Sequence, residues 1–176
     1  KALGAKVYAI NRRGETNLDV DFIGTLKQLE FILRESDIVV ISLPLTVRTR
    51  NLIGKKELEL MKKNVILINV SRGEIIDEKA LFEFLSKNSD AFAALDVWWK
   101  YPLDLKEKTY QDYPFHKLDN VIMSPHVAGF AEEIRENVIR NAAENTARFL
   151  RGEQPFNIAD KNEYIGIKRS GTQHES

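Results

Sequence analysis

Cysteine is absent from the 176 residues, which excludes disulfides, thiolate nucleophiles and cysteine-ligated zinc. The formal net charge is zero, because 26 basic residues balance 26 acidic ones, and this gives no support for nucleic acid or an acidic membrane as a partner. No apolar run approaches the length that spans a bilayer, and no signal peptide is visible. These absences are typical of a globular protein and give no support for a nucleic-acid, membrane or cysteine-ligated metal site; the cytoplasm is the expected location, and no metal is expected.

The first residue of the chain is not a methionine. Lys1 to Leu3 reads as the end of a helix, and Gly4 suits the left-handed position that follows a helix C-terminus. We therefore expect a fragment whose N-terminal part is missing. Its length is enough for one sizeable domain, or for one domain with an appendage.

Apolar runs alternate with amphipathic segments along the chain. Strands are expected at 7–10, 19–23, 37–43, 65–70, 91–97 and 120–123, and helices at about 26–33, 52–61, 78–85 and 131–150. Continuous apolar runs are typical of strands that are buried on both faces of a sheet. The alternation therefore predicts an α/β fold, with a doubly wound parallel sheet and helices on both of its faces.

The stretch from Asn64 to Leu81 (NVILINVSRGEIIDEKAL) carries the clearest pattern. Its apolar run stops at Ser71-Arg72-Gly73, and Asp77 stands where a helix N-cap is expected. Arg72 is thus predicted at the carboxyl end of a central strand, the edge at which open α/β sheets bind ligands. Its planar guanidinium suits a carboxylate. The alternative is an arginine that ties down a neighbouring loop through a salt bridge.

Three expected strand ends carry polar side chains, namely Arg72, Asp96 and His126. A doubly wound fold brings such ends to one edge of the sheet. Because histidine is the natural proton donor near neutral pH, this set suits binding of an oxo-acid and protonation of its carbonyl oxygen. Each residue also has a structural alternative, since Asp96 could cap a turn and His126 could serve packing.

Four ordered segments now carry a resemblance to a known family. They are SDIVVISLPLT (36–46), MKKNVILINVSRGEIIDEKAL (61–81), ALDV (94–97) and NVIMSPHVAG (120–129). The chain resembles the nucleotide-binding half of the D-isomer-specific 2-hydroxyacid dehydrogenases, which include phosphoglycerate dehydrogenase and glyoxylate/hydroxypyruvate reductase. The resemblance extends to about Phe156 and implies a Rossmann-type fold.

The resemblance also implies an activity, which is NAD(P)-dependent interconversion of a 2-oxo acid and a D-2-hydroxy acid. Arg72 would hold the substrate's carboxylate and carbonyl, His126 would be the acid/base, and Asp96 would contact the nicotinamide carboxamide. With these three residues, the positions that would line the cofactor are Leu43, Pro44, Val70, Ser71, Ala128 and Gly129. A homodimer is the expected assembly.

The glycine-rich phosphate-binding loop of the family, G-x-G-x-x-G, is absent from the sequence. We therefore expect residues 1–129 to be a Rossmann domain without its first strand and that loop. Residues 130–158 would be a long helix and a return segment leading toward an absent substrate domain, and residues 159–176 a partly disordered polar tail. A protein that began at Lys1 is predicted to have no turnover.

The acidic residue that binds the ribose 2′-hydroxyl in NAD enzymes is replaced here by Asn11, and Arg12 and Arg13 follow it. This reversal of charge favours NADP over NAD, because a 2′-phosphate would be attracted rather than repelled. The alternative is a pair of surface arginines, with Asn11 still serving NAD.

The family's usual LDVFxxEP reads LDVWWKYP in this sequence, so that Tyr101 stands where a glutamate normally pairs with the histidine. A neutral phenol cannot favour the imidazolium as a carboxylate does, although it can orient the ring. Tyr101 is therefore one candidate partner of His126, and Glu107 or Asp112 is another.

Loss of efficient catalysis is the third possibility at this position. It leads to a rival function, a nucleotide-sensing scaffold of the corepressor type. Retention of Arg72, Asp96 and His126 together favours the enzyme, because a scaffold need not keep a proton donor.

Overall fold

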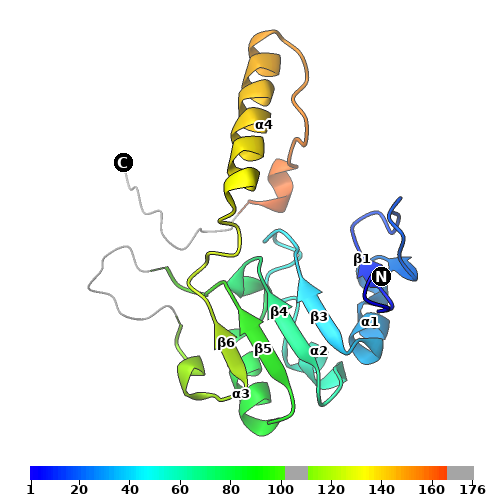
Figure 1. The fold of residues 1–176 in the computed structure, drawn as a ribbon, viewed down its shortest axis with the longest axis vertical. Helices are drawn as coiled ribbons and strands as arrows, with labels where there is room; N and C mark the ends of the chain where they lie inside the picture. Colours follow the sequence, from blue (N-terminus) through cyan, green and yellow to red (C-terminus); the bar gives the residue numbers. More distant parts are fainter. Residues whose placement is uncertain (102–110, 166–176) are drawn as a thin grey trace.

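The computed structural model describes residues 1–101 and 111–165, which form two parallel sheets (Figure 1). In the smaller sheet β1 (Tyr8–Ile10) pairs with β2 (Phe22–Gly24). In the larger sheet the order is β3 (Ile38–Ile41), β4 (Ile66–Asn69), β5 (Phe92–Leu95) and β6 (Val121–Met123), and all pairs are parallel. The predicted α/β class and parallel strands are confirmed.

The helices are α1 (Leu29–Glu35), α2 (Lys55–Leu60), α3 (Glu78–Lys87) and α4 (Glu132–Leu150). Short 3₁₀ turns cover Leu26–Gln28, Gly73–Ile75, Phe115–Lys117 and Lys161–Glu163. The N-cap predicted for α3 is confirmed, because the Asp77 carboxylate accepts a 2.7 Å hydrogen bond from the Ala80 N–H.

The main core lies between the larger sheet and α2 and α3. Leu81 and Leu85 are buried together, since residues four positions apart share one face of a helix. Leu67, in the middle of β4, is buried beneath them, and burial of each such leucine stabilises the fold by about 1.5–3 kcal/mol. This core holds the strands whose ends carry the candidate site.

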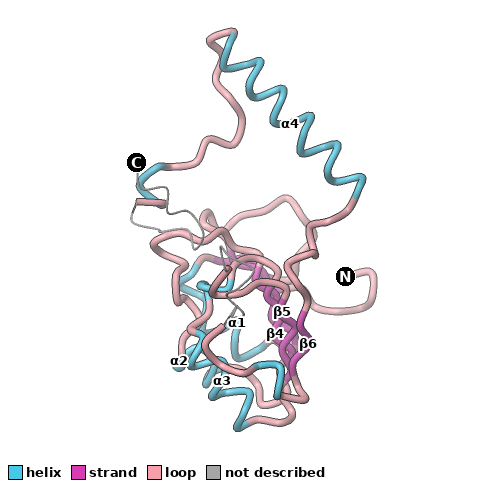
Figure 2. Tube along the Cα trace, turned by 90° about the vertical axis from the view of Figure 1, so that its left-hand side faces the viewer, coloured by secondary structure: helices cyan, strands magenta, loops and turns pink. Residues whose placement is uncertain are grey.

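The expectation of helices on both faces of the sheet does not hold in residues 1–101 and 111–165. Helices α1, α2 and α3 lie on one face (Figures 1 and 2), and the side chains of Ile38, Val40, Phe92 and Ile122 are exposed. Helix α4 projects away from the sheet instead of covering that face. A long amphipathic sequence predicts a helix, but it does not predict the surface against which that helix packs, because this surface comes from distant parts of the chain.

Helix α4 is joined to its own return segment. The Asn145 amide donates to the Phe156 carbonyl at 3.1 Å and accepts from the Phe156 N–H at 2.8 Å. The Arg148 guanidinium lies 4.2 Å from the centre of the Phe156 ring. The chain therefore turns back along α4 after Gly152, whose positive φ of 73° favours glycine.

Several predicted boundaries need correction. Residues 1–4 form a turn rather than the end of a helix, closed by the bond from the Gly4 N–H to the Lys1 carbonyl, although Gly4 does have the expected positive φ. The strand expected at 19–23 begins later and is β2 (Phe22–Gly24). Asp21 precedes it, and its carboxylate accepts a hydrogen bond from the Val7 N–H. The segment expected from residue 159 as a partly disordered tail contains the 3₁₀ turn Lys161–Glu163, and its residues 166–176 lie outside the described ranges. Within the described ranges, none of the helices has the length and apolar content to cross a bilayer.

Candidate active site

Four strand ends meet at one edge of the larger sheet. Ile41 of β3 pairs with Asn69 of β4, Asn69 with Leu95 of β5, and Leu95 with Met123 of β6. The segments that follow carry Arg72, Asp96 and His126, so the structure brings the three predicted residues to this edge. In open parallel sheets this is where ligands bind.

The turn that carries Arg72 is built by a buried amide. Asn69 is fully buried, its amide donates to the Arg72 carbonyl at 2.9 Å, and its side-chain oxygen accepts from the Ser71 N–H at 3.1 Å. The Ser71 hydroxyl donates to the Leu43 carbonyl at the end of β3. No role is predicted for Asn69 from the sequence, although an amide that interrupts an apolar run near its end is a visible signal.

Gly73 lets this turn approach the segment that follows β5. A Cβ atom at Gly73 would lie 2.4 Å from the carbonyl carbon of Trp98 and 2.8 Å from the amide nitrogen of Trp99. The Trp99 indole N–H donates to the Ile76 carbonyl at 2.7 Å, and its ring stacks on Phe115. The absence of a side chain at Gly73 therefore fixes the spacing between the Arg72 turn and the Asp96 segment.

The Arg72 guanidinium is exposed, and its Nη1 donates to the Ser71 carbonyl at 2.6 Å. Among the residues that the structure describes, no carboxylate forms an ion pair with it, so the salt-bridge alternative has no support. Arg72 opens into a cleft of about 780 Å³, lined by Ser42, Leu43, Pro44, Leu45, Val70, Ser71, Glu74, Tyr101, His126 and Tyr164. The predicted cofactor positions Leu43, Pro44, Val70 and Ser71 all line this cleft.

A second cavity adjoins the first on the side of α4. It measures about 810 Å³ and is lined by Val70, Arg72, Asp96, His126 and Gly129, by Phe130 and Ala131 just before α4, and by Ile134, Arg135, Val138 and Ile139 of α4. Gly129, predicted as a cofactor position, therefore lines the same cavity as the predicted catalytic residues Arg72 and His126.

Asp96 is only 4% exposed, and both of its oxygens are engaged. Oδ1 accepts from the Ser124 hydroxyl at 2.6 Å and from the Val127 N–H at 2.9 Å, while Oδ2 accepts from the Ala128 N–H at 2.9 Å. Burial alone would raise the pKa of Asp96, but these hydrogen bonds and the nearby His126 lower it below the usual 3.8. An ionised Asp96 therefore holds the loop on either side of His126.

His126 itself has a φ of +58°, a conformation that residues with a side chain seldom adopt. The bonds from Asp96 fix the residues after it, and the Trp98 indole N–H fixes the loop before it by donating to the Ser124 carbonyl at 3.1 Å. The imidazole is exposed to the cleft. Contacts from the segment that follows β5 thus hold the unusual backbone geometry at which the loop presents the imidazole.

Tyr101 lies beside His126, with ring centres 5.4 Å apart and planes inclined by 44°. The Tyr101 hydroxyl accepts the Trp98 N–H at 3.1 Å, and burial raises the pKa of this phenol above 10.0, which keeps it neutral. The contact with the imidazole is one between rings. This geometry suits orientation of His126 by packing.

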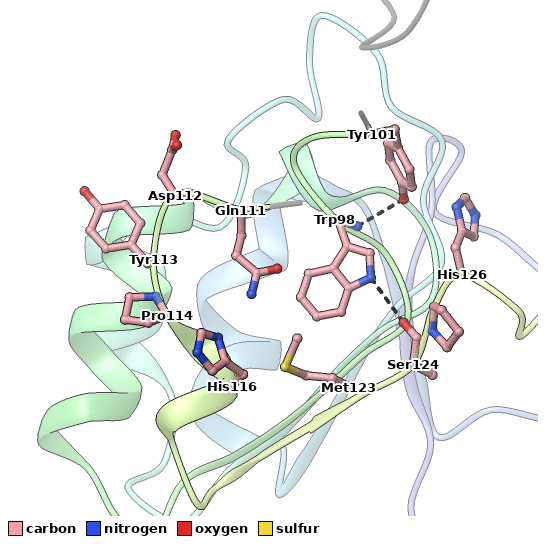
Figure 3. A pocket seen from close by; sticks show the side chains of 11 residues that line it. Trp98, Tyr101, Gln111, Asp112, Tyr113, Pro114, His116, Met123, Ser124 and His126 are labelled. Carbon is pink, nitrogen blue, oxygen red and sulfur yellow. Dashed lines mark hydrogen bonds between the residues drawn. The ribbon is translucent and has the colours of Figure 1, made fainter. Parts of the chain in front are cut away.

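Asp112 is excluded as the partner of His126. Its carboxylate contacts Lys100, and Figure 3 shows it across a cavity of about 680 Å³ from His126 and Tyr101. The other candidate, Glu107, lies outside the described residues.

The turn after β1 carries the residues predicted to select the cofactor. The Asn11 side chain accepts from the N–H groups of Arg13 and Gly14 at 2.9 and 2.7 Å, and it donates to the Glu15 carbonyl at 2.9 Å. Its hydrogen bonds are thus directed to its own turn. Arg12 and Arg13 are exposed, and Asn11, Arg12 and Arg13 all lie outside the lining of the two clefts at Arg72.

Comparison with known proteins places the chain in a family. Residues 1–128 match the model of the NAD-binding domain of D-isomer-specific 2-hydroxyacid dehydrogenases. The chain belongs to this family. It is 37% identical to a glyoxylate reductase of Aeropyrum pernix over 97% of its own length and 49% of the relative's. The chain thus spans about half the length of the relatives that it matches.

Solved structures give the same assignment. A D-isomer-specific 2-hydroxyacid dehydrogenase of Xanthobacter autotrophicus, in complex with NADPH and MES, is 32% identical, with a TM-score of 0.73 over 92% of this chain and 64% of that one. A D-lactate dehydrogenase of Lactobacillus jensenii with NAD⁺ is 31% identical, with a TM-score of 0.68 over 90% and 49%. These relatives are named as enzymes, so the scaffold alternative gains no support from them.

Proposed function

We propose that this chain is the nucleotide-binding part of an enzyme that interconverts a 2-oxo acid and a D-2-hydroxy acid, with glyoxylate as the first substrate to test. One observation carries the proposal. Arg72 and His126 line the same cleft, and each is presented by a separate buried hydrogen-bonded clamp, centred on Asn69 and Asp96 respectively. Loops whose backbone is fixed in this way, and whose side chains line one cleft, are typical of a site that is organised before its ligand binds.

The residues of the cleft fit a nicotinamide cofactor. Leu43, Pro44 and Val70 supply apolar walls at the carboxyl ends of β3 and β4, where dinucleotides lie in doubly wound folds. When bound, the nicotinamide would exchange a hydride with the carbon that carries the substrate's oxygen. The charges of Arg12 and Arg13, with no acidic residue at Asn11, support NADP as the preferred form.

Arg72 and His126 would have complementary roles. The exposed guanidinium of Arg72 would bind the substrate's carboxylate and polarise the neighbouring carbonyl. His126 would give a proton to the carbonyl oxygen as it becomes a hydroxyl, and would take that proton back in the reverse reaction. Tyr101 would keep the imidazole oriented by ring packing, in place of the family's usual glutamate.

Steady-state reduction of glyoxylate by the full-length gene product, with NADPH and with NADH, tests this proposal. His126→Ala should lower kcat by about a hundredfold or more while cofactor binding persists. The matched control is His116→Ala, which removes an exposed histidine on the 3₁₀ turn Phe115–Lys117. Turnover that survives His126→Ala would contradict the assigned role. Absence of turnover with every 2-oxo acid would contradict the reaction.

A homodimer is retained as part of the proposal. Light scattering on the full-length product should give twice the mass of one chain. A monomer at micromolar concentration would contradict it.

A further inference from the structure

The chain folds back toward the cleft after α4. The segment ends in the turn Lys161–Glu163, which begins with the Asp160 carboxylate accepting the Asn162 N–H at 2.9 Å. The Val47 N–H, in the segment that follows β3, donates to the Glu163 carbonyl at 3.0 Å. A backbone hydrogen bond therefore attaches this segment beside the strand end that lines the cleft.

Two neighbouring side chains of this segment contact two parts of the proposed site. The Glu163 carboxylate lies 3.1 Å from Nη1 of Arg12, a residue 151 positions away in the sequence. The next residue, Tyr164, lines the cleft that holds Arg72 and His126. The segment thus spans from the arginine turn after β1 to the candidate catalytic residues.

The ion pair is asymmetric in its exposure. The Glu163 side chain is 19% exposed, whereas that of Arg12 is 71% exposed. The carboxylate is thus held in place while the guanidinium faces solvent. A 2′-phosphate that approached Arg12 would meet this carboxylate, and the like charges would repel each other.

We propose that Glu163 is a specificity-determining residue that lowers the affinity of the Arg12 site for a 2′-phosphate. The inference rests on the proposed function, in which the charges of Arg12 and Arg13 favour NADP, and it takes Arg12 as the residue that meets the 2′-phosphate. Glu163 acts through Arg12, because its carboxylate partly neutralises the guanidinium. The enzyme would then retain use of NADH despite its arginine pair.

Glu163→Gln separates the charge from the fold of the segment. Glutamine has almost the same shape and can still accept a hydrogen bond from Arg12. The bond from Val47 is unaffected, because it uses the backbone carbonyl of residue 163. Glu153→Gln is the matched control, since the Glu153 carboxylate pairs with Arg151 and Arg148 at the C-terminal end of α4.

Calorimetric titration of the full-length protein with adenosine 2′,5′-bisphosphate and with 5′-AMP provides the readout. Neither probe contains nicotinamide, so binding is measured independently of turnover. Glu163→Gln should tighten the bisphosphate by about fivefold, the upper range for an exposed ion pair, and leave 5′-AMP within about twofold. Arg12→Gln should weaken the bisphosphate by roughly tenfold, and the double variant should show no gain from Glu163→Gln.

The outcomes separate this inference from the proposed function. Equal changes for both probes, or no change with Glu163→Gln, would overturn the role of Glu163. If Arg12→Gln left bisphosphate binding unchanged, both that role and the NADP assignment would be rejected. If the wild-type protein failed to reduce any 2-oxo acid, the reaction would be rejected, and the two titrations would still decide the role of Glu163.

Discussion

Replacement of Asp96 by asparagine is the sharpest perturbation of the site. The two side chains have nearly the same shape, but only one end of an amide accepts hydrogen bonds. If the amide oxygen takes the place of Oδ1, it keeps the bonds from Ser124 and Val127. The NH₂ group then faces the Ala128 N–H, which loses its acceptor beside a second donor.

The expected cost follows from that count of bonds. One charge-assisted hydrogen bond is lost and one donor at a site only 4% exposed is left unpaired, so the free energy of unfolding should fall by about 2–3 kcal/mol. Asp96→Ala leaves all three donors without the carboxylate and should cost about 4 kcal/mol or more. Because the same bonds hold the left-handed backbone of His126, both variants should also lower kcat more than they raise KM.

The pH dependence of stability gives a second readout. Since the pKa of Asp96 is lower in the folded protein than the usual 3.8, its contribution to stability is complete above that pH. This contribution is lost as the pH falls below about 3.8 and then through the lower pKa that Asp96 has in the folded protein. Asp96→Asn removes this titration, so the stability difference between wild type and variant should shrink over the same range.

Urea unfolding followed by circular dichroism, at neutral pH and in a series down to pH 3, measures both effects. Asp119→Asn is the control, because Asp119 is exposed and lies in the same connection between β5 and β6. The reasoning is refuted if Asp96→Asn unfolds within about 0.5 kcal/mol of the wild type, the range of ordinary surface substitutions. It is also refuted if the acid-dependent loss of stability is the same in both proteins.

Three further predictions concern the surroundings of the site. Gly73→Ala should lower the free energy of unfolding in urea by about 1–3 kcal/mol, since its Cβ would lie 2.4 Å from the Trp98 carbonyl carbon. Gly129→Ala should leave this free energy unchanged, because no atom lies within 4 Å of a Cβ there. Equal effects of the two variants would contradict the packing argument. Leu67→Ala should cost about 2–5 kcal/mol in the same assay, and a smaller loss would mean that the core collapses into the cavity. Tyr101→Phe should leave kcat within about threefold, because the ring contact is kept, and a hundredfold loss would show that the hydroxyl takes part in proton transfer.

Strand ends were predictable because the end of an apolar run is local information. The run that stops at Ser71 and the polar residues at Asp96 and His126 were enough to place the site at one edge of the sheet. The buried amide of Asn69 carried a local signal that was overlooked. The pairing of Glu163 with Arg12 carried none, since it joins residues 151 positions apart through the return of the chain.

The layering of the fold was less predictable than the order of its elements. Alternating strands and helices indicate parallel pairing, and this is what the structure has. They do not state which face each helix covers, because that depends on crossovers and on surfaces distant in sequence. Helix α4 shows the difference, since its length was predicted closely and its position was not.

The two indole rings lie beside the candidate site and can report on it optically. Trp98 and Trp99 are the only tryptophans in the sequence. The first is hydrogen-bonded to the loop that presents His126, and the second to the segment that follows the Arg72 turn. Within this stretch of the protein, fluorescence excited at the indole band therefore arises from two residues that frame the candidate site. A change in its intensity or wavelength would follow that loop and turn directly, without a label or an added chromophore.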